Sequence, residues 1–187
     1  MLLDFSIFEK YGFAVIDCDE VSRFVTDAGS PCTAELAEEF GDEILNSDGT
    51  LRRRVLAEVA FSDAKKLETL NKITHRHILN EVFARVENYR SKGFAAVVID
   101  APVLFESGLD KRCDTTLAIC APREIRLERI IARDGISAQS AEVRISRQLS
   151  EKELATLADR VIVNDGTLEE LKNNITNYVK EIGESLD

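Results

Sequence analysis

The sequence lacks the patterns that mark several common classes of protein. Its four cysteines form no C-x-x-C pair, so neither a zinc site nor a disulfide framework is predicted, and a reducing cytoplasm is the expected location. No apolar run reaches the length of a membrane span, and the first residues do not have the composition of a signal peptide. Internal repeats and low-complexity linkers are also absent.

The chain also has little positive charge relative to its negative charge. With 24 Lys and Arg against 34 Asp and Glu, the formal net charge is -10. This balance argues against nucleic acid or an anionic membrane as the main partner, but it leaves room for a local basic pocket that binds a phosphorylated small molecule. The length of 187 residues fits one α/β domain with an insertion and suffices to bury a core.

Two apolar runs, each ending in an aspartate, organise the chain. Residues 95–99 are rich in β-branched side chains, which predicts a strand buried on both faces of a parallel sheet. This run stops at Asp100, before Pro102, and residues 13–17 end in the same way at Asp17. Because open α/β sheets bind ligands at the carboxyl ends of their strands, the two acids are expected to meet in one cleft. The alternative is that each acid only caps the turn that follows it.

Helical patterns fill most of the remaining sequence. Residues 2–12 have an apolar face at helical spacing, and residues 20–92 are predicted to be almost wholly helical. A parallel crossover needs only one helix, so this stretch is predicted to contain an inserted helical subdomain. Thr33 is the predicted cap of a helix through Phe40, Ser62 or Asp63 is the predicted cap of the next helix, and a long helix is expected over residues 75–89.

Strands and helices alternate again after residue 108. Strands are predicted over 115–120 and 161–163, and helices over 122–133, 137–148, 151–157 and 167–182. Pro122 stands at the start of the first of these helices, a position that suits proline, and Asp134-Gly135 ends it. The whole pattern predicts an α/β fold with a parallel sheet covered by helices on both faces.

Three acids are candidates for chemistry at the strand ends. Asp17 and Asp19 are two residues apart, so they would share a face if the strand continued. Together with Asp100 they could hold Mg²⁺ through water or orient an attacking hydroxyl. The simpler hypothesis is that all three only form turns and cap helices, and their spacing does not separate the two.

Arginines gather in two places. Residues 52–54 are three consecutive arginines, and five more lie between the predicted third and fourth strands: Arg126, Arg129, Arg133, Arg144 and Arg147. The first three of these five share one helical face, and planar guanidinium groups bind phosphates through paired hydrogen bonds. The alternative, given equal weight, is a solvent-exposed face on which Glu124 and Glu128 are intrahelical partners.

The two histidines, His75 and His77, flank Arg76. Residues two positions apart do not share a helix face, so a metal site is not predicted here. His75 could bind a phosphate or cap the helix. By composition alone, the simpler hypothesis of a polar residue at a helix start is favoured.

Several different short motifs are distributed along nearly the whole chain. They are V-I-D-C-D at 15–19, F-G at 40–41 with D-G-T-L-R-R at 48–53, D-A-P-V-L-F-E-S-G at 100–108, the arginines at 129, 133 and 144 with D-G at 134–135, and V-I-V-N-D-G at 161–166. The ordered set resembles the dephospho-coenzyme A (dephospho-CoA) kinase family of P-loop kinases. The segment around His75 departs from the family pattern, since Arg76 stands where the family has proline.

The resemblance implies transfer of the ATP γ-phosphoryl group to the 3′-hydroxyl of dephospho-CoA, with Mg²⁺ as cofactor and without a nucleic-acid or membrane partner. The implied catalytic residues are Asp17, which would orient or deprotonate the hydroxyl, Asp100, near which Mg²⁺ would be held through water, and Arg133. The implied acceptor-binding residues are Asp19, Arg53, His75, Pro102, Leu104 and Glu106. The implied ATP-binding and lid residues are Arg129, Arg133, Arg144, Asn164 and Gly166.

The resemblance also implies how a single kinase-like domain spanning residues 1–187 is divided. Residues 1–27, 93–122 and 158–187 would form the core of the domain. Residues 28–92 would form a helical insertion that binds the acceptor, and residues 123–157 would form the lid region.

One part of the family pattern is not found in the sequence. The family begins with a strand and a glycine-rich loop, G-G-x-x-x-G-K-[ST], and that strand is central in the sheet, between the counterparts of residues 94–100 and 115–120. We expect a truncated gene model, or else a natural deletion, to account for the difference, and we expect the chain as printed to be inactive as a kinase. The alternatives are a catalytically dead binder of dephospho-CoA or CoA, and a fragment without stable function.

Overall fold

The computed structural model describes residues 5–186, without the side chain of Leu186. The helix predicted over residues 2–12 therefore lies partly outside the described residues. Within them, a short helix, α1 (Ser6–Glu9), leads through a turn to Gly12, whose φ of 75° is the left-handed conformation expected of a glycine just past a helix. The chain divides into two compact units, Gly12–Ser107 and Met1–Tyr11 with Gly108–Asp187.

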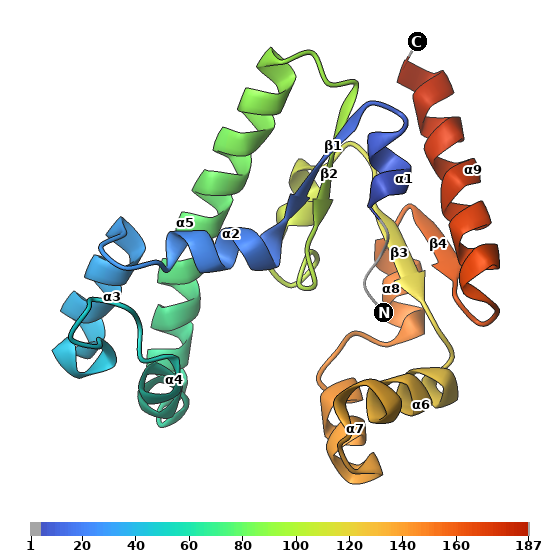
Figure 1. The fold of residues 1–187 in the computed structure, drawn as a ribbon. Coiled ribbons are helices and arrows are strands. Elements are labelled where there is room, and N and C mark those ends of the chain that lie inside the picture. Colours follow the sequence, from blue (N-terminus) through green and yellow to red (C-terminus); the bar gives the residue numbers. More distant parts are fainter. Residues whose placement is uncertain (1–4, 187) are drawn as a thin grey trace. The chain divides into compact units, whose positions relative to one another are not determined.

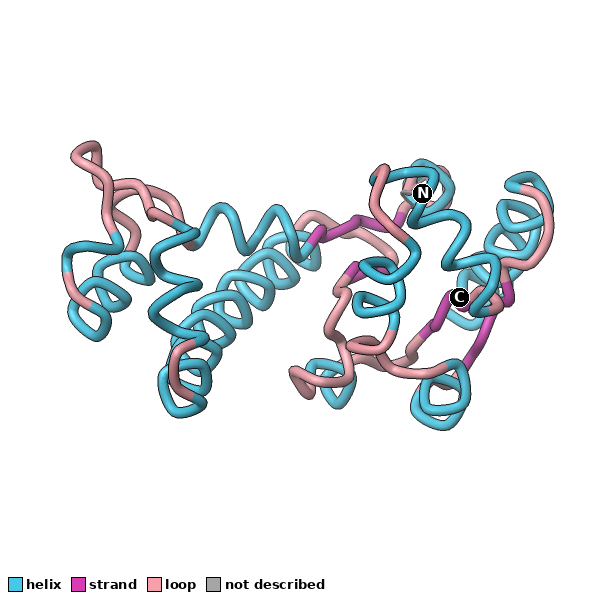
Figure 2. Tube along the Cα trace, turned by 90° about the horizontal axis from the view of Figure 1, so that it is seen from below, coloured by secondary structure: helices cyan, strands magenta, loops and turns pink. Residues whose placement is uncertain are grey.

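The unit Gly12–Ser107 contains two strands that pair in parallel, and its helices come between these strands in the sequence (Figure 1). Strand β1 (Phe13–Asp17) pairs with β2 (Ala96–Asp100) in a register that places Asp17 opposite Asp100. The intervening elements are α2 (Cys18–Val25), α3 (Pro31–Phe40), the 3₁₀ helix η1 (Asp42–Ile44), α4 (Arg53–Phe61) and α5 (Ala64–Ser91). The prediction that residues 20–92 are almost wholly helical is confirmed, and Figure 2 shows how short the strands are beside these helices.

The core of this unit forms where α2, α3 and α4 pack against α5. The helix α5 contains neither glycine nor proline, so nothing in its sequence interrupts its 28 residues. Five of the most deeply buried apolar side chains around it come from β1, α2, α3, η1 and α5 itself: Ile16, Val21, Leu36, Ile44 and Val82. This packing fixes α2, and with it the end of β1, against a long and uninterrupted helix.

The second unit also contains one parallel strand pair. Strand β3 (Leu117–Cys120) pairs with β4 (Arg160–Val163). The other elements of this unit are η2 (Leu109–Arg112), α6 (Arg123–Asp134), α7 (Ala138–Ile145), α8 (Glu151–Leu157) and α9 (Leu168–Leu186), and α1 contacts α9. The predicted strands and helices after residue 108 are thus confirmed, with shifts of a few residues at their ends.

Paired hydrogen bonds fix the start of β3 against the start of β4. The carboxylate Oδ2 of Asp159 accepts from the backbone N–H of Thr116 at 2.8 Å and from its hydroxyl at 2.7 Å. The Thr116 hydroxyl in turn accepts from the Asp159 backbone N–H at 3.0 Å. These bonds, the side-chain bond first, hold the pKa of Asp159 below its usual range, so the strand pair is braced by a carboxylate that stays ionised at neutral pH.

Two details of the helical segment differ from the sequence prediction. Ser30, not Thr33, caps α3, because its hydroxyl accepts from the Thr33 backbone N–H while Pro31 occupies the first helical position. The helix expected to start at residue 75 is the second half of α5, which Asp63 caps through a 2.8 Å bond from the Lys65 N–H. His75 is therefore inside a helix and not at its start.

The strand β2 is less buried than predicted. Each of its five residues is half-buried, whereas the sequence predicted burial on both faces. Among residues 5–186, β2 pairs with β1 alone, so a valine-rich strand lies at the edge of its sheet, a position in which strands are usually charged or covered. Separately, none of the described helices is both long enough and apolar enough to cross a lipid bilayer.

We predict that Leu36→Ala lowers the free energy of unfolding by about 2–5 kcal/mol, because the fully buried Leu36 side chain would leave a cavity against α5. Urea denaturation followed by circular dichroism measures the change. Phe61→Ala is the control, since Phe61 is 71% exposed, and its effect should stay within about 0.5 kcal/mol. Equal effects of the two substitutions would contradict the position of the core.

Candidate active site

Two carboxylates lie side by side at the carboxyl end of the first strand pair. Asp17 ends β1 and Asp100 ends β2, and the parallel register makes them direct partners. Both residues are half-buried. The two acids thus lie at the same edge of one sheet, and their meeting in a cleft stays a prediction. We call Asp17, Asp100 and the neighbouring Asp19 the acidic edge.

The alternative hypothesis of a capping role also holds for Asp17. Its Oδ1 accepts from the backbone N–H of Asp19 at 2.7 Å and of Glu20 at 3.1 Å, which caps α2. The strand does not continue beyond Asp17, so Asp17 and Asp19 do not share a strand face: the cap turns the chain directly into α2, and Asp19 is exposed in its first turn. The cap occupies one carboxylate oxygen of Asp17 and fixes the side chain in place.

Charge accumulates at the acidic edge. Burial raises the pKa of Asp100, and the negative charges of Asp17 and Asp19 raise it further. Carboxylate oxygens suit Mg²⁺. Within the described residues, however, no group of three His, Cys, Asp or Glu side chains could hold a metal ion directly. A cation at this edge would therefore have to be held through its water ligands.

Arg53, predicted to bind the acceptor, is oriented by a neighbouring helix. Its Nη2 donates to the hydroxyl of the buried Thr26 at 2.9 Å, and that hydroxyl donates to the Ser22 carbonyl at 2.6 Å. Arg53 also lines an open hollow of about 450 Å³ formed by Asn46, Arg52, Arg53, Arg54, Val55 and Glu58. Arg53 is exposed, and its hydrogen bond to Thr26 holds the guanidinium at a polar surface depression.

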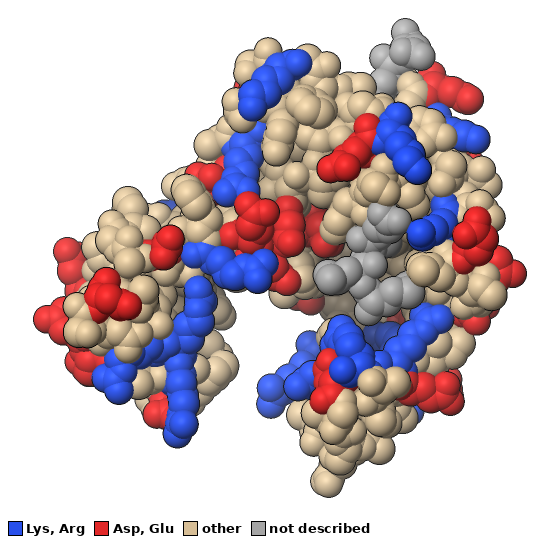
Figure 3. Space-filling view, in the orientation of Figure 1, with Lys and Arg blue, Asp and Glu red and all other residues tan. Residues whose placement is uncertain are grey.

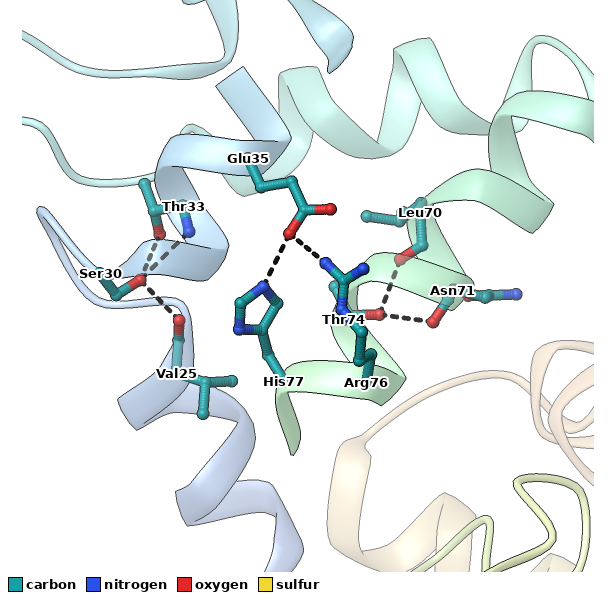
Figure 4. A network of polar contacts seen from close by, with 9 residues as sticks. All are labelled: Val25, Ser30, Thr33, Glu35, Leu70, Asn71, Thr74, Arg76 and His77. Carbon is teal, nitrogen blue, oxygen red and sulfur yellow. Dashed lines mark hydrogen bonds and ion pairs between the residues drawn. The ribbon is translucent and has the colours of Figure 1, made fainter. Parts of the chain in front are cut away.

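His77, two residues after the predicted site residue His75 on α5, contacts the neighbouring helix α3. The Nε2 of His77 is 2.8 Å from Oε2 of Glu35 on α3, and Arg76 bonds the same oxygen (Figure 4). The hydrogen bond with His77, and then that from Arg76, hold the pKa of Glu35 below its usual range. Sequence reasoning missed Glu35, which lies some forty residues away on another helix. Neither short motifs nor helical spacing could reveal that pairing.

The remaining predicted acceptor residues lie in the turns after β2. The Leu104 N–H donates to the Ala101 carbonyl at 3.2 Å, and the Ser107 N–H donates to the Val103 carbonyl at 3.0 Å, so this segment is a series of tight turns. Pro102 and Glu106 are exposed and Leu104 is half-buried. The segment follows Asp100 directly, which keeps these side chains in the same unit as the acidic edge.

In the second unit, Arg129 is fastened to the turn after β4. Its Nη1 donates to the Asn164 carbonyl at 3.0 Å and its Nη2 to the Gly166 carbonyl at 3.4 Å. Asn164 is 7% exposed, and its side-chain Oδ1 is buried without a hydrogen-bond partner. Three of the residues predicted to bind ATP, Arg129, Asn164 and Gly166, are therefore brought together by the fold.

Arg133 and Arg144 meet on one carboxylate. The Nε and Nη2 of Arg133 bond the two oxygens of Asp134 at 2.7 and 3.0 Å, and Nη1 of Arg144 bonds Oδ2 of the same residue. Figure 3 shows Lys and Arg side chains gathered over α6 and α7. Among residues 5–186, the arginines Arg123, Arg133 and Arg144 of α6 and α7 form ion pairs with Asp134 and Glu142, and not with the expected partners Glu124 and Glu128.

Comparison with known proteins defines the class of this fold. A crystal structure of TT1252 from Thermus thermophilus is 28% identical and has a TM-score of 0.75, with 94% of this chain and 88% of that chain covered. A dephospho-CoA kinase from Campylobacter jejuni has a TM-score of 0.70 over 96% and 92% of the two chains, at 23% identity. The chain has the P-loop kinase fold, with parallel strands and flanking helices, as the sequence predicts.

The family follows from the sequence comparisons. A family model described as Dephospho-CoA kinase matches residues 5–170. The Dephospho-CoA kinase of Corynebacterium glutamicum is 37% identical over 91% of this chain and 88% of its own, and that of Carboxydothermus hydrogenoformans is 34% identical over 94% and 85%. The chain belongs to the dephospho-CoA kinase family.

We predict that Asp100→Asn raises the melting temperature at pH 7. The raised pKa of Asp100 means that the folded state is at its most stable below the usual Asp pKa and loses stability as pH rises through the raised value. Asparagine cannot ionise and escapes this loss. The difference from wild type should shrink as pH falls toward about 4.

Scanning calorimetry between pH 4 and pH 8 measures this effect. The matched control is Asp42→Asn, which makes the same chemical change at an exposed position of the same unit and should leave the melting temperature nearly constant. A melting temperature for Asp100→Asn that is equal to or below that of wild type at pH 7 would show that ionisation of Asp100 does not destabilise the folded state.

Proposed function

We propose that the residues of this chain serve the transfer of the γ-phosphoryl group of ATP to the 3′-hydroxyl of dephospho-CoA, the final step of CoA biosynthesis, and that the transfer also requires an upstream strand and glycine-rich loop. The observation that carries the proposal is the in-register pair of Asp17 and Asp100 at the carboxyl ends of β1 and β2, in a chain that belongs to the dephospho-CoA kinase family. In α/β sheets this is the edge at which ligands bind. The four free cysteines are in keeping with the reducing cytoplasm in which the reaction would take place.

Asp17 is the group that receives or orients the proton of the attacking hydroxyl. Its Oδ1 is committed to the α2 cap, so Oδ2 is the oxygen available to the acceptor. Because the cap fixes the carboxylate, the acceptor hydroxyl meets an oriented base with little cost in side-chain entropy. One residue thus serves both the fold and the chemistry.

Asp100 supports the cation. When bound, Mg²⁺ supplies positive charge that neutralises the phosphates during transfer. Asp100 would hold a water of its coordination sphere, since the neighbouring charges of Asp17 and Asp19 make this edge favourable for a cation. The negative charge that the fold concentrates here is then offset by the bound ion.

The other predicted residues take roles in binding. The acceptor would contact the helical insertion of residues 28–92 and the turns after β2, through Asp19, Arg53, His75, Pro102, Leu104 and Glu106. Residues 123–157 would act as a lid whose arginines, Arg129, Arg133 and Arg144, meet the triphosphate and exclude water. Asn164 and Gly166 would lie near the adenine, where the unpartnered Oδ1 of Asn164 supports a role as a hydrogen-bond acceptor.

A second function, binding without catalysis, is favoured by one observation. The printed sequence contains no G-x-x-x-x-G-K-[ST] loop, whose backbone N–H groups and lysine form the phosphate cradle of P-loop kinases. The acceptor-side residues are nevertheless present. A chain with these residues alone would retain affinity for dephospho-CoA while turning over slowly or not at all.

We predict that the 187-residue chain binds dephospho-CoA with saturable heat in calorimetry but releases no measurable ADP in a coupled assay with ATP and Mg²⁺. A version extended upstream by a strand and a glycine-rich loop should release ADP, because the loop supplies the missing positive field around the phosphates. Robust ADP release by the 187-residue chain would show that the loop is not required for phosphoryl transfer. Failure of both versions to bind dephospho-CoA would overturn the proposed function.

We predict that Asp17→Asn in the extended version lowers kcat by about 10²–10⁴ with little change in acceptor affinity. Asparagine caps helices as well as aspartate does, so α2 should keep its cap and the loss should report chemistry. The matched control is Asp63→Asn, which makes the same change at the cap of α5 and should leave kcat unchanged. An unaltered kcat for Asp17→Asn would show that Asp17 does not receive or orient the proton of the attacking hydroxyl.

A further inference from the structure

Asp134 ends α6 and holds two arginines from different helices. It bonds Arg133, its neighbour in the chain, through both carboxylate oxygens, and it bonds Arg144 in the last turn of α7 through Oδ2. The next residue, Gly135, has a φ of 63° and turns the chain away from α6. We call Arg133, Asp134 and Arg144 the arginine fork. Sequence reasoning treated Asp134 only as part of the helix break.

The exposure of the three side chains differs within the fork. Asp134 is 19% exposed, whereas Arg133 is 60% and Arg144 is 54% exposed. A guanidinium has five N–H donors. Arg133 directs Nε and Nη2 at Asp134 and Arg144 directs Nη1, so Nη1 of Arg133 and Nη2 of Arg144 remain available to a ligand. The carboxylate is thus the inner part of the fork and the unused donors are its outer part.

We infer that Asp134 is a positioning residue that holds Arg133 and Arg144 together as one anion-binding fork for a polyphosphate chain. The inference rests on the proposed function in one respect, namely that the polyphosphate is that of the nucleotide. Planar guanidiniums that are anchored on one side bind phosphate oxygens on the other side with little further loss of side-chain entropy. Without Asp134, two long and exposed side chains would have to be ordered by the ligand itself.

Charge alone predicts the opposite effect of removing Asp134, and this makes the inference testable. Arg133 holds the pKa of Asp134 below its usual range, so at neutral pH the fork carries two positive charges and one negative charge. Neutralising Asp134 raises the net positive charge by one, which by attraction alone would tighten the binding of an anion. If Asp134 positions the arginines, its neutralisation weakens the binding.

The same two helices supply a matched control. Arg123 on α6 forms an ion pair with Glu142 on α7, apart from the residues of the fork. Glu142→Gln removes one negative charge and one α6–α7 ion pair, just as Asp134→Asn does, but leaves Arg133 and Arg144 anchored. Any effect that comes only from net charge or from looser packing of α6 on α7 should therefore appear in both variants.

Isothermal titration of the 187-residue chain with sodium tripolyphosphate tests the inference. We expect Asp134→Asn to raise Kd by at least about fivefold, because charge-assisted hydrogen bonds to two guanidiniums lose their common anchor. Asp134→Glu, which keeps the carboxylate, should recover part of the affinity, and Glu142→Gln should stay within about twofold of wild type. Arg133→Lys keeps the charge but cannot bond both Asp134 oxygens, so it should resemble Asp134→Asn.

Three outcomes would overturn the inference: unchanged or tighter binding by Asp134→Asn, an equal loss in Glu142→Gln, or no binding of tripolyphosphate by wild type. If thermal melting shows that Asp134→Asn does not fold, the ranking of wild type, Asp134→Glu and Glu142→Gln decides the question: a loss of affinity in Asp134→Glu beyond that in Glu142→Gln supports the role of Asp134, and equal affinities refute it. Titration of the same samples with dephospho-CoA keeps the two proposals distinct. A chain that binds dephospho-CoA but fails the tripolyphosphate ranking refutes the role of Asp134 and leaves the proposed function standing.

Discussion

The parallel pairing of β1 with β2 is the interaction on which the rest of this structure depends. It is a register of five residue pairs, and its last pair is Asp17 with Asp100. A slip of one residue would move every side chain of one strand to the opposite face and would separate the two acids. Ile16, the residue before Asp17, belongs to the same buried cluster as side chains of α2 and α5, so β1 links the helical core to the acidic edge.

The sequence predicted the elements of the fold well, because their signals are local. Apolar runs that end in Asp17 and Asp100, caps such as Asp63 and Ser137, and left-handed glycines such as Gly135 all act within a few residues. The burial of β2 was predicted less well. Composition shows that a strand is apolar, but it does not show how many neighbours cover it, and β2 has β1 as its partner within the described residues.

The candidate site shows the same division between local and distant signals. The meeting of Asp17 and Asp100 followed from the rule that parallel strands end at one edge, whereas the turn into α2 that exposes Asp19 did not follow from spacing. The partners that set side-chain positions were missed: Thr26 for Arg53, Glu35 for His77, and Asp134 for Arg144. Each of these pairs joins different helices, and one sequence without a fold contains no signal for such contacts.

The length of the β1–β2 crossover has a consequence for the order of folding. The paired residues Phe13 and Ala96 are 83 positions apart, and the segment that joins β1 to β2 is mostly helical. Helices form within microseconds from neighbouring residues, but joining the strands requires closure of this whole segment, whose entropic cost comes before the strand contacts stabilise it. We therefore expect the helices to assemble first and the two aspartates to be brought together in a late step. Newly made chains would then pass through a compact helical stage in which neither acid yet has its partner.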